Sequence, residues 1–443
     1  GGFDRTIISK FSELMKQIYS ALFVLFLFIS CKAASQEREI FRMTVLKQYP
    51  EMRKRLFDAR VSADEKEIYS AILDNVFGNA ASSNERIAKI LARGGVKFDS
   101  LQHSLLETQH SNYVKLFDYK RAYESKKYLM DNYLSYTKEE NRFDEEQAMN
   151  IWQALQDAPR QEVLHAKEIV SMPMTKDPVL GLQRIPVSKG GKEYSFIFDT
   201  GAGISTIMDS MARVLGLSIY DKVPVVIKGG ITGLGTNVKL GIADKLNLGG
   251  IEVRNVLFLV FPDSALTFKT GPTSVVKVDV ILGFPVIKEL ERITLYADRM
   301  EIDNRAQIRK PGPPNMAIEY LKPIIYLEYE GEELPFTFDT GADETVFSEV
   351  FYKKHRAIID KTGKKDVEQY GGAGGIKAFN VMKVPSLSFG CLGTTITLKD
   401  AAVSTEVIHT GDDVYYGNVG QDVIQQFKSM TIDFKESRIT FNR

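Results

Sequence analysis

The chain has 443 residues, and at roughly 150 residues per domain this length suggests about three compact units. Its 57 basic residues balance 57 acidic ones, which argues against a nucleic-acid binder that works through bulk positive charge. Two Cys and five scattered His form neither a disulfide framework nor a zinc-finger spacing, so we expect no metal and no cofactor.

An uncharged apolar run occupies residues 18–29. A membrane-spanning helix needs about 20 such residues, so this run is too short and has the length of a signal-peptide core. It ends in FISC (28–31), which resembles the lipid-attachment site of bacterial lipoproteins. We predict that residues 1–31 contain a signal peptide, and Met15-Lys16 is typical of its natural start. The resemblance implies lipidation of Cys31. It also implies a lipid-anchored membrane protein of the bacterial cell envelope, periplasmic or outer-membrane associated. A cleaved secretory signal and a short core helix are the alternatives.

Glycine content divides the rest of the chain into a helical and a β-rich part. Five glycines lie in residues 1–180 and 28 in the remaining 263 residues. Helices avoid glycine, sheet-and-turn folds collect it, and apolar residues recur at helical spacing up to about residue 164. We therefore predict a helical domain over residues 32–170.

Within this domain, residues 112–133 resemble one helical hairpin of a tetratricopeptide repeat, with Asp118 and Tyr119 at the turn. Only one copy is recognisable, whereas an array would show its period of about 34 residues several times. An ordinary helical hairpin therefore stays open as the alternative. We expect the domain either to bind a protein partner or to act as a spacer next to the membrane.

Two proline-containing segments divide the β-rich part into halves of similar length. The first contains Ser171-Met172-Pro173-Met174, and the second lies at residues 304–316, where proline and glycine cannot continue a strand or a helix. We predict one lobe over residues 171–303, a linker over 304–316 and a second lobe over 317–443.

The two halves contain a duplicated motif. Residues 194–207 and 334–347 align without a gap at an offset of 140. In each half a turn and an alternating apolar run precede an aspartate, which predicts a β-hairpin that places the aspartate at a strand end. The shared residues are Phe196/Phe336, Phe198/Phe338, Asp199/Asp339, Thr200/Thr340, Gly201/Gly341 and Ala202/Ala342.

A second duplicated motif lies near the end of each half, where the segment from Ile281 aligns with the segment from Asn418 at an offset of 137. Between the two motifs each half has a glycine cluster, which begins 30 and 32 residues after the respective aspartate. These clusters contain Gly229, Gly230 and Ile231 in one half and Gly371, Gly372 and Ala373 in the other. Repeated features in the same order at nearly constant spacing establish an internal duplication.

This pattern resembles the aspartic peptidases, and their retropepsin-like branch in particular. The marks of the family are an apolar-Asp-Thr-Gly-Ala motif, a glycine-rich flap and an apolar-apolar-Gly segment that crosses behind the catalytic loop. The resemblance covers about residues 180–443. It implies an N-terminal all-α region followed by an all-β double-lobed aspartic peptidase, in which two retropepsin-like β-barrel lobes are related by a pseudo-twofold axis.

The resemblance also implies the site residues. It makes Asp199 and Asp339 the catalytic dyad, and the glycine clusters flaps that bind the substrate. The residues that would support the two catalytic loops are Thr200, Gly201, Thr340 and Gly341. Two carboxylates about 3 Å apart cannot both ionise, so they share a proton and supply a base and an acid together. We therefore predict an aspartic endopeptidase that hydrolyses peptide bonds in extended polypeptides with a water activated between Asp199 and Asp339.

Some residues depart from the family pattern or bear on its pH range. Ala202 and Ala342 cannot donate a hydrogen bond to a carboxylate as Ser or Thr could, so we predict activity that extends towards weakly acidic or neutral pH. Asn418 replaces an apolar residue, and Gly203 replaces the acidic residue that matches Asp343. We expect both changes to alter the packing around a loop without touching either Asp-Thr-Gly triplet.

Two other interpretations of the duplication stay open. A non-catalytic, peptide-binding envelope lipoprotein would use the same cleft, although both aspartates are intact. Alternatively, each lobe pairs with a lobe of another molecule, whereas the linked duplication favours a monomer with a pseudo-dimeric active site. The expected partner is a peptide or protein substrate, and no nucleic acid.

Overall fold

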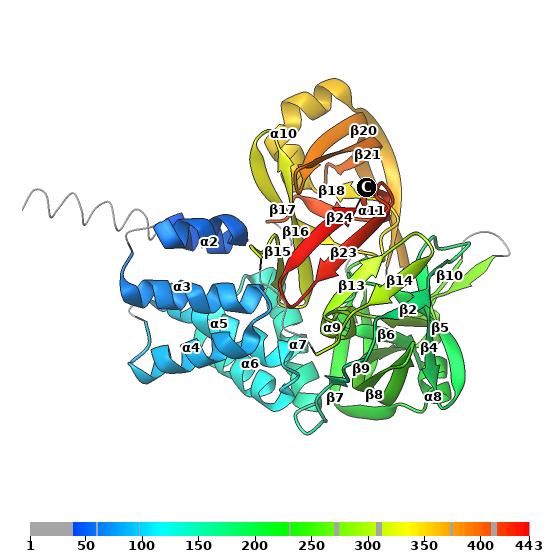
Figure 1. Ribbon diagram of the computed structural model, residues 1–443, viewed down its shortest axis with the longest axis horizontal. Helices are drawn as coiled ribbons and strands as arrows, with labels where there is room; N and C mark the ends of the chain where they lie inside the picture. Colours follow the sequence, from blue (N-terminus) through cyan, green and yellow to red (C-terminus); the bar gives the residue numbers. More distant parts are fainter. Residues whose placement is uncertain are drawn as a thin grey trace, which may run out of the picture. The chain divides into compact units, whose positions relative to one another are not determined.

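The computed structural model describes residues 39–58, 61–96, 98–229, 232–269, 274–306, 312–372, 375–408 and 414–442 (Figure 1). It divides into two compact units, the first ending at Tyr69 and the second beginning at Ser70. The described part of the first unit contains α2 (Tyr49–Asp58) and the first half of α3 (Ala63–Val76). Among the described residues, no helix has the length and apolar character needed to cross a membrane.

The second unit begins with a series of helices joined by short turns. After the end of α3 these are α4 (Ala80–Ala92), α5 (Asp99–Lys115), α6 (Tyr119–Tyr133), the 3₁₀ turns η1 (Leu134–Tyr136) and η2 (Glu139–Asn141), and α7 (Arg142–Ala154). The start of α6 is fixed by Asp118, whose side chain accepts a hydrogen bond from the Arg121 N–H at 3.3 Å. One face of α6 is buried at helical spacing, through Tyr119, Ala122, Lys126 and Leu129.

The β-structure starts before the end of the segment that the sequence assigns to the helical domain. The first strand, β1 (Glu162–Val163), pairs with β9 (Ile251–Phe261) of the first lobe. The next strand, β2 (Val170–Pro173), pairs with β14 (Arg299–Ile302). The chain between α7 and residue 173 is therefore part of the β-rich architecture.

The first lobe is one sheet that closes on itself. Its strands lie in the order β1-β9-β6-β12-β5-β4-β8-β7, and β8 pairs with β9 as well. The remaining elements are β3 (Thr175–Lys176), β4 (Gln183–Lys189), β5 (Lys192–Phe198), β6 (Ser205–Met208), α8 (Asp209–Val214), β7 (Ser218–Lys228), β8 (Gly235–Leu248), η3 (Asp263–Leu266), β10 (Thr267–Lys269), β11 (Val275–Lys277), β12 (Val280–Leu282) and α9 (Phe284–Glu289). Closure leaves few unpaired edges and encloses a core of alternating apolar side chains.

The second lobe repeats this plan. Its strands lie in the order β15-β16-β17-β22-β18-β21-β20-β19, and β16 also pairs with β20. The elements are β15 (Met316–Glu319), β16 (Lys322–Tyr329), β17 (Glu332–Phe338), β18 (Val346–Phe347), α10 (Glu349–Thr362), β19 (Lys364–Gly372), β20 (Gly375–Cys391), β21 (Thr394–Ser404), β22 (Gly417–Val419) and α11 (Gln421–Ile424). The predicted fold class, a helical region followed by two β-rich lobes, is confirmed.

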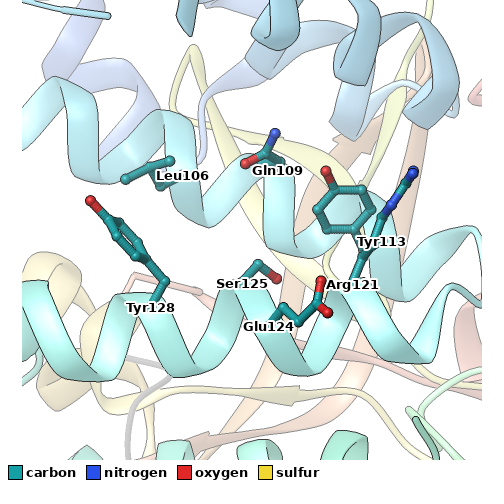
Figure 2. Close-up of a pocket in the computed structure, with 7 residues that line it drawn as sticks. All are labelled: Leu106, Gln109, Tyr113, Arg121, Glu124, Ser125 and Tyr128. Carbon is teal, nitrogen blue, oxygen red and sulfur yellow. The ribbon is translucent and has the colours of Figure 1, made fainter. Parts of the chain in front are cut away.

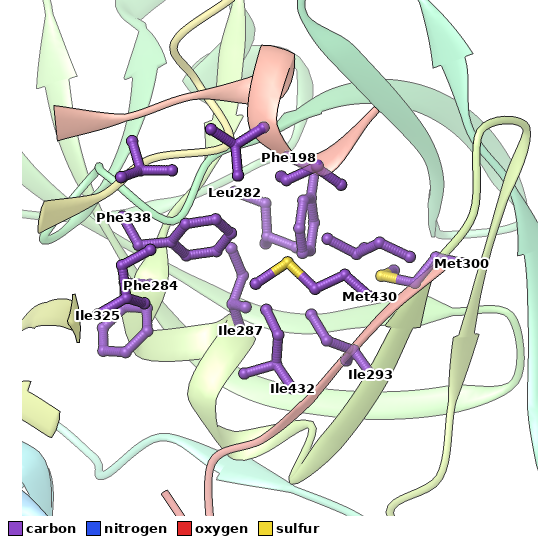
Figure 3. Close-up of a cluster of buried hydrophobic side chains, with 14 of the residues drawn as sticks. Phe198, Leu282, Phe284, Ile287, Ile293, Met300, Ile325, Phe338, Met430 and Ile432 are labelled. Carbon is purple, nitrogen blue, oxygen red and sulfur yellow. The ribbon is translucent and has the colours of Figure 1, made fainter. Parts of the chain in front are cut away.

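A third sheet joins the lobes. Strand β13 (Arg292–Leu295) of the first repeat pairs with β23 (Ser429–Asp433) of the second. With β24 (Arg438–Asn442), the strands of this sheet lie in the order β2-β14-β13-β23-β24. At its centre the hydroxyl groups of Thr294 and Thr431, which match in the duplication, hydrogen-bond at 3.0 Å. Figure 3 shows apolar side chains from both repeats in one cluster beside this sheet, among them Phe198, Phe338, Ile293 and Ile432. The two repeats therefore share a core.

The helices also share a core with the first lobe. A buried cluster combines helical residues such as Trp152 and Leu155 with lobe residues such as Val225 and Leu240. In addition, the Lys115 ammonium group at the end of α5 donates a hydrogen bond to the carbonyl oxygen of Ile318 at 2.7 Å. The helices from α5 to α7 are thus packed against the lobes.

Candidate active site

Asp199 directly follows β5, at a point where two strands of the first lobe run in parallel. Strand β5 pairs with β12 through Ile197 and Phe198, and the Asp199 N–H donates to the Leu282 carbonyl oxygen at 3.1 Å. The chain then passes behind the loop at Gly283, where an added Cβ would lie 2.7 Å from the carbonyl oxygen of Ala202. The apolar-apolar-Gly segment therefore holds the Asp-Thr-Gly loop from behind, and its glycine allows the close approach.

The second lobe builds the same loop around Asp339. Strand β17 pairs with β22 in parallel, and the Asp339 N–H donates to the carbonyl oxygen of Val419 at 2.9 Å. An added Cβ at Gly420 would lie 2.8 Å from the Ala342 carbonyl oxygen. The duplicated sequence motifs thus produce two equivalent supports, one under each aspartate.

The structure brings Asp199 and Asp339 together. A Cβ added at Gly341 would lie 2.5 Å from Cγ of Asp199, and one added at Gly201 would collide in the same way with the carboxyl group of Asp339. Burial raises the pKa of Asp199 well above its ordinary value of 3.8, and the charge of Asp339 and a hydrogen bond with its side chain raise it further. One carboxyl group of the pair therefore retains a proton well above that pH.

The loops are tied to each other by four hydrogen bonds through Thr200 and Thr340. Each threonine N–H donates to the hydroxyl group of the other, at 3.0 and 2.9 Å. Each hydroxyl group donates to the carbonyl oxygen that precedes the opposite aspartate, that of Phe338 or of Phe198, at 3.0 Å. Both threonines are buried, so these reciprocal bonds fix one loop relative to the other across the pseudo-twofold axis.

Backbone N–H groups point at both carboxyl groups. Gly201 and Gly341 each donate to Oδ1 of the aspartate in their own loop at 2.7 Å. The Ala202 N–H adds a longer bond of 3.2 Å to Oδ1 of Asp199. These donors hold the side chains in place and stabilise negative charge on them.

Asn418 contacts one of the two aspartates directly. Its Nδ2 donates a hydrogen bond to Oδ2 of Asp339 at 3.1 Å. The expectation that Asn418 leaves the Asp-Thr-Gly triplet untouched is therefore wrong. The available signal was a paired change, because Thr337 and Asn418 together replace Ile197 and Ile281 of the first half.

The two glycine clusters lie at the ends of long hairpins. In the first lobe β7 and β8 form the hairpin with Gly229 next to its turn, and in the second lobe Gly371 and Gly372 end β19 opposite the start of β20. The hairpin ends approach each other, since a Cβ at Gly375 would lie 3.6 Å from Cγ2 of Thr232. Three of the predicted flap residues lie outside the described residues, namely Gly230, Ile231 and Ala373.

Other features of the described residues do not offer the same chemistry. A pocket of about 250 Å³ lies between α5 and α6. Figure 2 shows the residues that line it, which are Leu106, Gln109, Tyr113, Arg121, Glu124, Ser125 and Tyr128. Glu124 is the single carboxylate in this lining, so no carboxylate pair forms there. Over the described ranges, no group of three or more His, Cys, Asp or Glu residues is arranged to hold a metal. Cys31, the predicted lipidation site, lies outside the described residues, and the envelope location stays a prediction.

The fold and this site define a two-lobed β protein with paired Asp-Thr-Gly loops, and the comparisons with known proteins bear on the first lobe. Residues 185–286, which include Asp199, match the protein family described as aspartyl protease, so this lobe contains an aspartyl protease domain.

Similar solved structures include two seed globulins. Basic 7S globulin from soybean is 12% identical, covers 62% of this chain and 94% of its own, and has a TM-score of 0.39. Conglutin gamma, a basic 7S globulin from lupine seeds, is 10% identical, covers 62% of this chain and 95% of its own, and has a TM-score of 0.37. No curated protein sequence matches the chain.

Proposed function

We propose that this protein is an aspartic endopeptidase whose catalytic pair is Asp199 and Asp339. The observation that carries the proposal is the reciprocal placement of the two loops, in which each Asp-Thr-Gly glycine faces the carboxyl group of the other lobe. The aspartyl protease match over the first lobe supports it.

The chemistry requires one ionised and one protonated carboxyl group at the same pH. The ionised group removes a proton from a water held between the pair, and the oxygen of that water bonds to the carbonyl carbon of the peptide bond. The protonated group gives its proton to the carbonyl oxygen. The C–N bond of the neutral tetrahedral intermediate then breaks as the nitrogen takes up the proton removed from the water, and a hydroxyl group of the intermediate returns its proton to the other carboxylate. The raised pKa of Asp199 supports such a division of protonation states.

The substrate class follows from the hairpins. An extended peptide that lies between the dyad and the two hairpin ends would pair its backbone groups with theirs, and closing hairpins would exclude water from the reaction. Because backbone pairing is independent of side chains, we propose polypeptides of varied sequence as substrates. The glycines at both hairpin ends suit such a close backbone approach.

The alternative function is peptide binding without hydrolysis in the same place. A mixture of synthetic peptides, incubated with the full chain between pH 4 and 7.5 and followed by mass spectrometry, separates the two. The peptidase proposal expects new termini that Asp339→Asn does not produce. Asp343→Asn is the matched control, because Asp343 lies four residues after Asp339 and pairs with Lys176 at 3.2 Å. Peptide binding measured by calorimetry, with no new termini from folded protein at any pH, would establish the binding function instead.

A further inference from the structure

One polar chain in the second lobe leads from a strand interior to the dyad. The hydroxyl group of Thr337 donates to Oδ1 of Asn418 at 2.6 Å, and Nδ2 of Asn418 donates to Oδ2 of Asp339 at 3.1 Å. Thr337 lies two residues before Asp339 on β17, and Asn418 is its register partner on β22. Both side chains are partly buried.

The first lobe has no equivalent of this chain. The positions that match Thr337 and Asn418 are Ile197 and Ile281, and they are register partners as well. An apolar pair under one aspartate is thus replaced, at both positions, by a hydrogen-bonded polar pair under the other. A polar pair at a partly buried position costs free energy unless both members are satisfied, and here each has its partner.

The direction of the hydrogen bonds determines which form of Asp339 they favour. With Oδ1 of Asn418 engaged by the Thr337 hydroxyl, the Nδ2 group faces the carboxyl oxygen and can only donate to it. Asp339 then accepts at both oxygens, since Gly341 donates to Oδ1. Both backbone donors to Asp199, in contrast, reach the same oxygen, Oδ1. Donation to an oxygen favours the ionised carboxylate.

The other charged groups near these loops are already engaged or point elsewhere. Asp343 is paired with Lys176, and Asp422 of α11 accepts the hydroxyl group of Thr345 at 2.6 Å. The charge of Glu344 helps to raise the pKa of Tyr370 in the second hairpin. Strand β22 contributes no charged residue, and among the described residues Asp199 is the charged group that acts directly on Asp339.

We propose that Asn418, oriented by Thr337, is a positioning residue that keeps Asp339 as the ionised member of the pair and leaves the shared proton on Asp199. Its catalytic consequence rests on the proposed function, in which Asp339 activates the water and Asp199 protonates the carbonyl oxygen. The raised pKa of Asp199 agrees with this assignment.

The test replaces the polar pair with the apolar pair of the first lobe. Asn418→Ile and the double variant Thr337→Ile with Asn418→Ile are compared with the parent by the pH dependence of kcat/KM and by NMR titration of [¹³Cγ]-aspartate. Loss of a hydrogen-bond donor to the ionised form raises the pKa of the first ionisation of the pair. We therefore expect the acidic limb of the kcat/KM profile and the matching NMR transition to move up by about one pH unit. The double variant places in the second lobe the same Ile–Ile pair that already packs in the first lobe. If the single variant does not fold, the double variant provides the test.

Two further variants separate positioning from packing. Thr337→Val removes the hydroxyl group that orients the Asn418 amide, and we expect the acidic limb to shift in the same direction by a smaller amount. Thr337→Ser keeps a hydroxyl group and should retain the parent's acidic limb. An NMR transition that moves in a protein that cleaves no peptide supports the proton assignment and contradicts the peptidase proposal. An acidic limb and NMR transition that stay in place in both Asn418→Ile proteins, or a change confined to KM, overturn the inference.

Discussion

Each Asp-Thr-Gly loop places its glycine against the carboxyl group of the opposite lobe, which leaves no room for a side chain. Gly201→Ala and Gly341→Ala should each displace the opposing carboxyl group, because the added Cβ would overlap it. A displacement of about 1 Å at a reacting group can cost about 100-fold in rate, and we expect a loss of this order in kcat/KM. Gly203→Ala is the control in the same loop, since its Cβ would meet Leu321 at an ordinary 3.7 Å. Equal activity in the Gly201 and Gly203 variants would contradict the described loop contact.

The raised pKa of Asp199 makes a prediction about stability that does not depend on catalysis. The unfolded chain loses this proton near pH 3.8, whereas the folded protein retains it to higher pH. Proton binding therefore favours the folded state at low pH, and this contribution is lost as the pH rises through the folded-state pKa. Asp199→Asn has no carboxyl group that titrates at this position. Its free energy of unfolding relative to the parent should therefore increase as the pH is raised above about 4. Urea unfolding of both proteins at several pH values checks this, and a pH-independent difference would contradict it.

At the scale of elements, α7 braces the first hairpin. Oε1 of Gln147 accepts a hydrogen bond from the Val226 N–H at 2.8 Å, and the Lys228 ammonium group lies 4.0 Å from the centre of the Phe143 ring. The helix therefore contacts β7 close to the hairpin end that bears Gly229.

Removing this brace should loosen the hairpin locally. Gln147→Leu takes away the acceptor, and since a hydrogen bond contributes about 1 kcal/mol we expect roughly fivefold faster amide exchange at Val226. Glu146→Gln, an exposed change one residue away on α7, is the matched control. Hydrogen exchange followed by mass spectrometry over β7 measures both, and unchanged exchange in Gln147→Leu would show that α7 does not brace the hairpin.

The elements that carry the dyad could be predicted from the sequence because each motif occurs once in each half of the β-rich part. The match of Asp199 with Asp339 and of Gly283 with Gly420 indicated two equivalent loops, and the loops are built from those residues. The contact of Asn418 was not predicted, because it depends on which register partner lies beside an aspartate and where its amide points. The contacts of α7 with β7 could not be predicted either. Sequence periodicity shows which face of a helix is buried, but not which element packs against that face.

In the whole molecule, the helices from α5 to α7 do more than separate the lobes from the N-terminus. Trp152 and Leu155 lie in one buried cluster with Val225 and Leu240. A chain that starts at Ser171 would expose these lobe side chains to water, at a cost of about 1.5 to 3 kcal/mol for each large one.

We therefore expect the chain that starts at Ser171 to have a lower Tm, to aggregate and to lose most of the peptidase activity. Thermal unfolding and cleavage assays on the truncated and full chains measure these effects. The spacer interpretation expects the opposite, a truncated protein with the Tm and the kcat/KM of the full chain, and that result would contradict the shared core.

In the proposed function, one chain supplies both carboxyl groups of a peptidase. The most direct measurement is kcat/KM on a peptide found to be cleaved, for the parent, Asp199→Asn and Asp339→Asn at the parent's optimal pH. Folding of each variant is checked by circular dichroism. Because the aspartates act as one unit, each single variant should lose at least about 1,000-fold in kcat/KM while keeping the parent's fold. Folded variants that cleave as fast as the parent, or a loss confined to one of the two, would contradict the dyad.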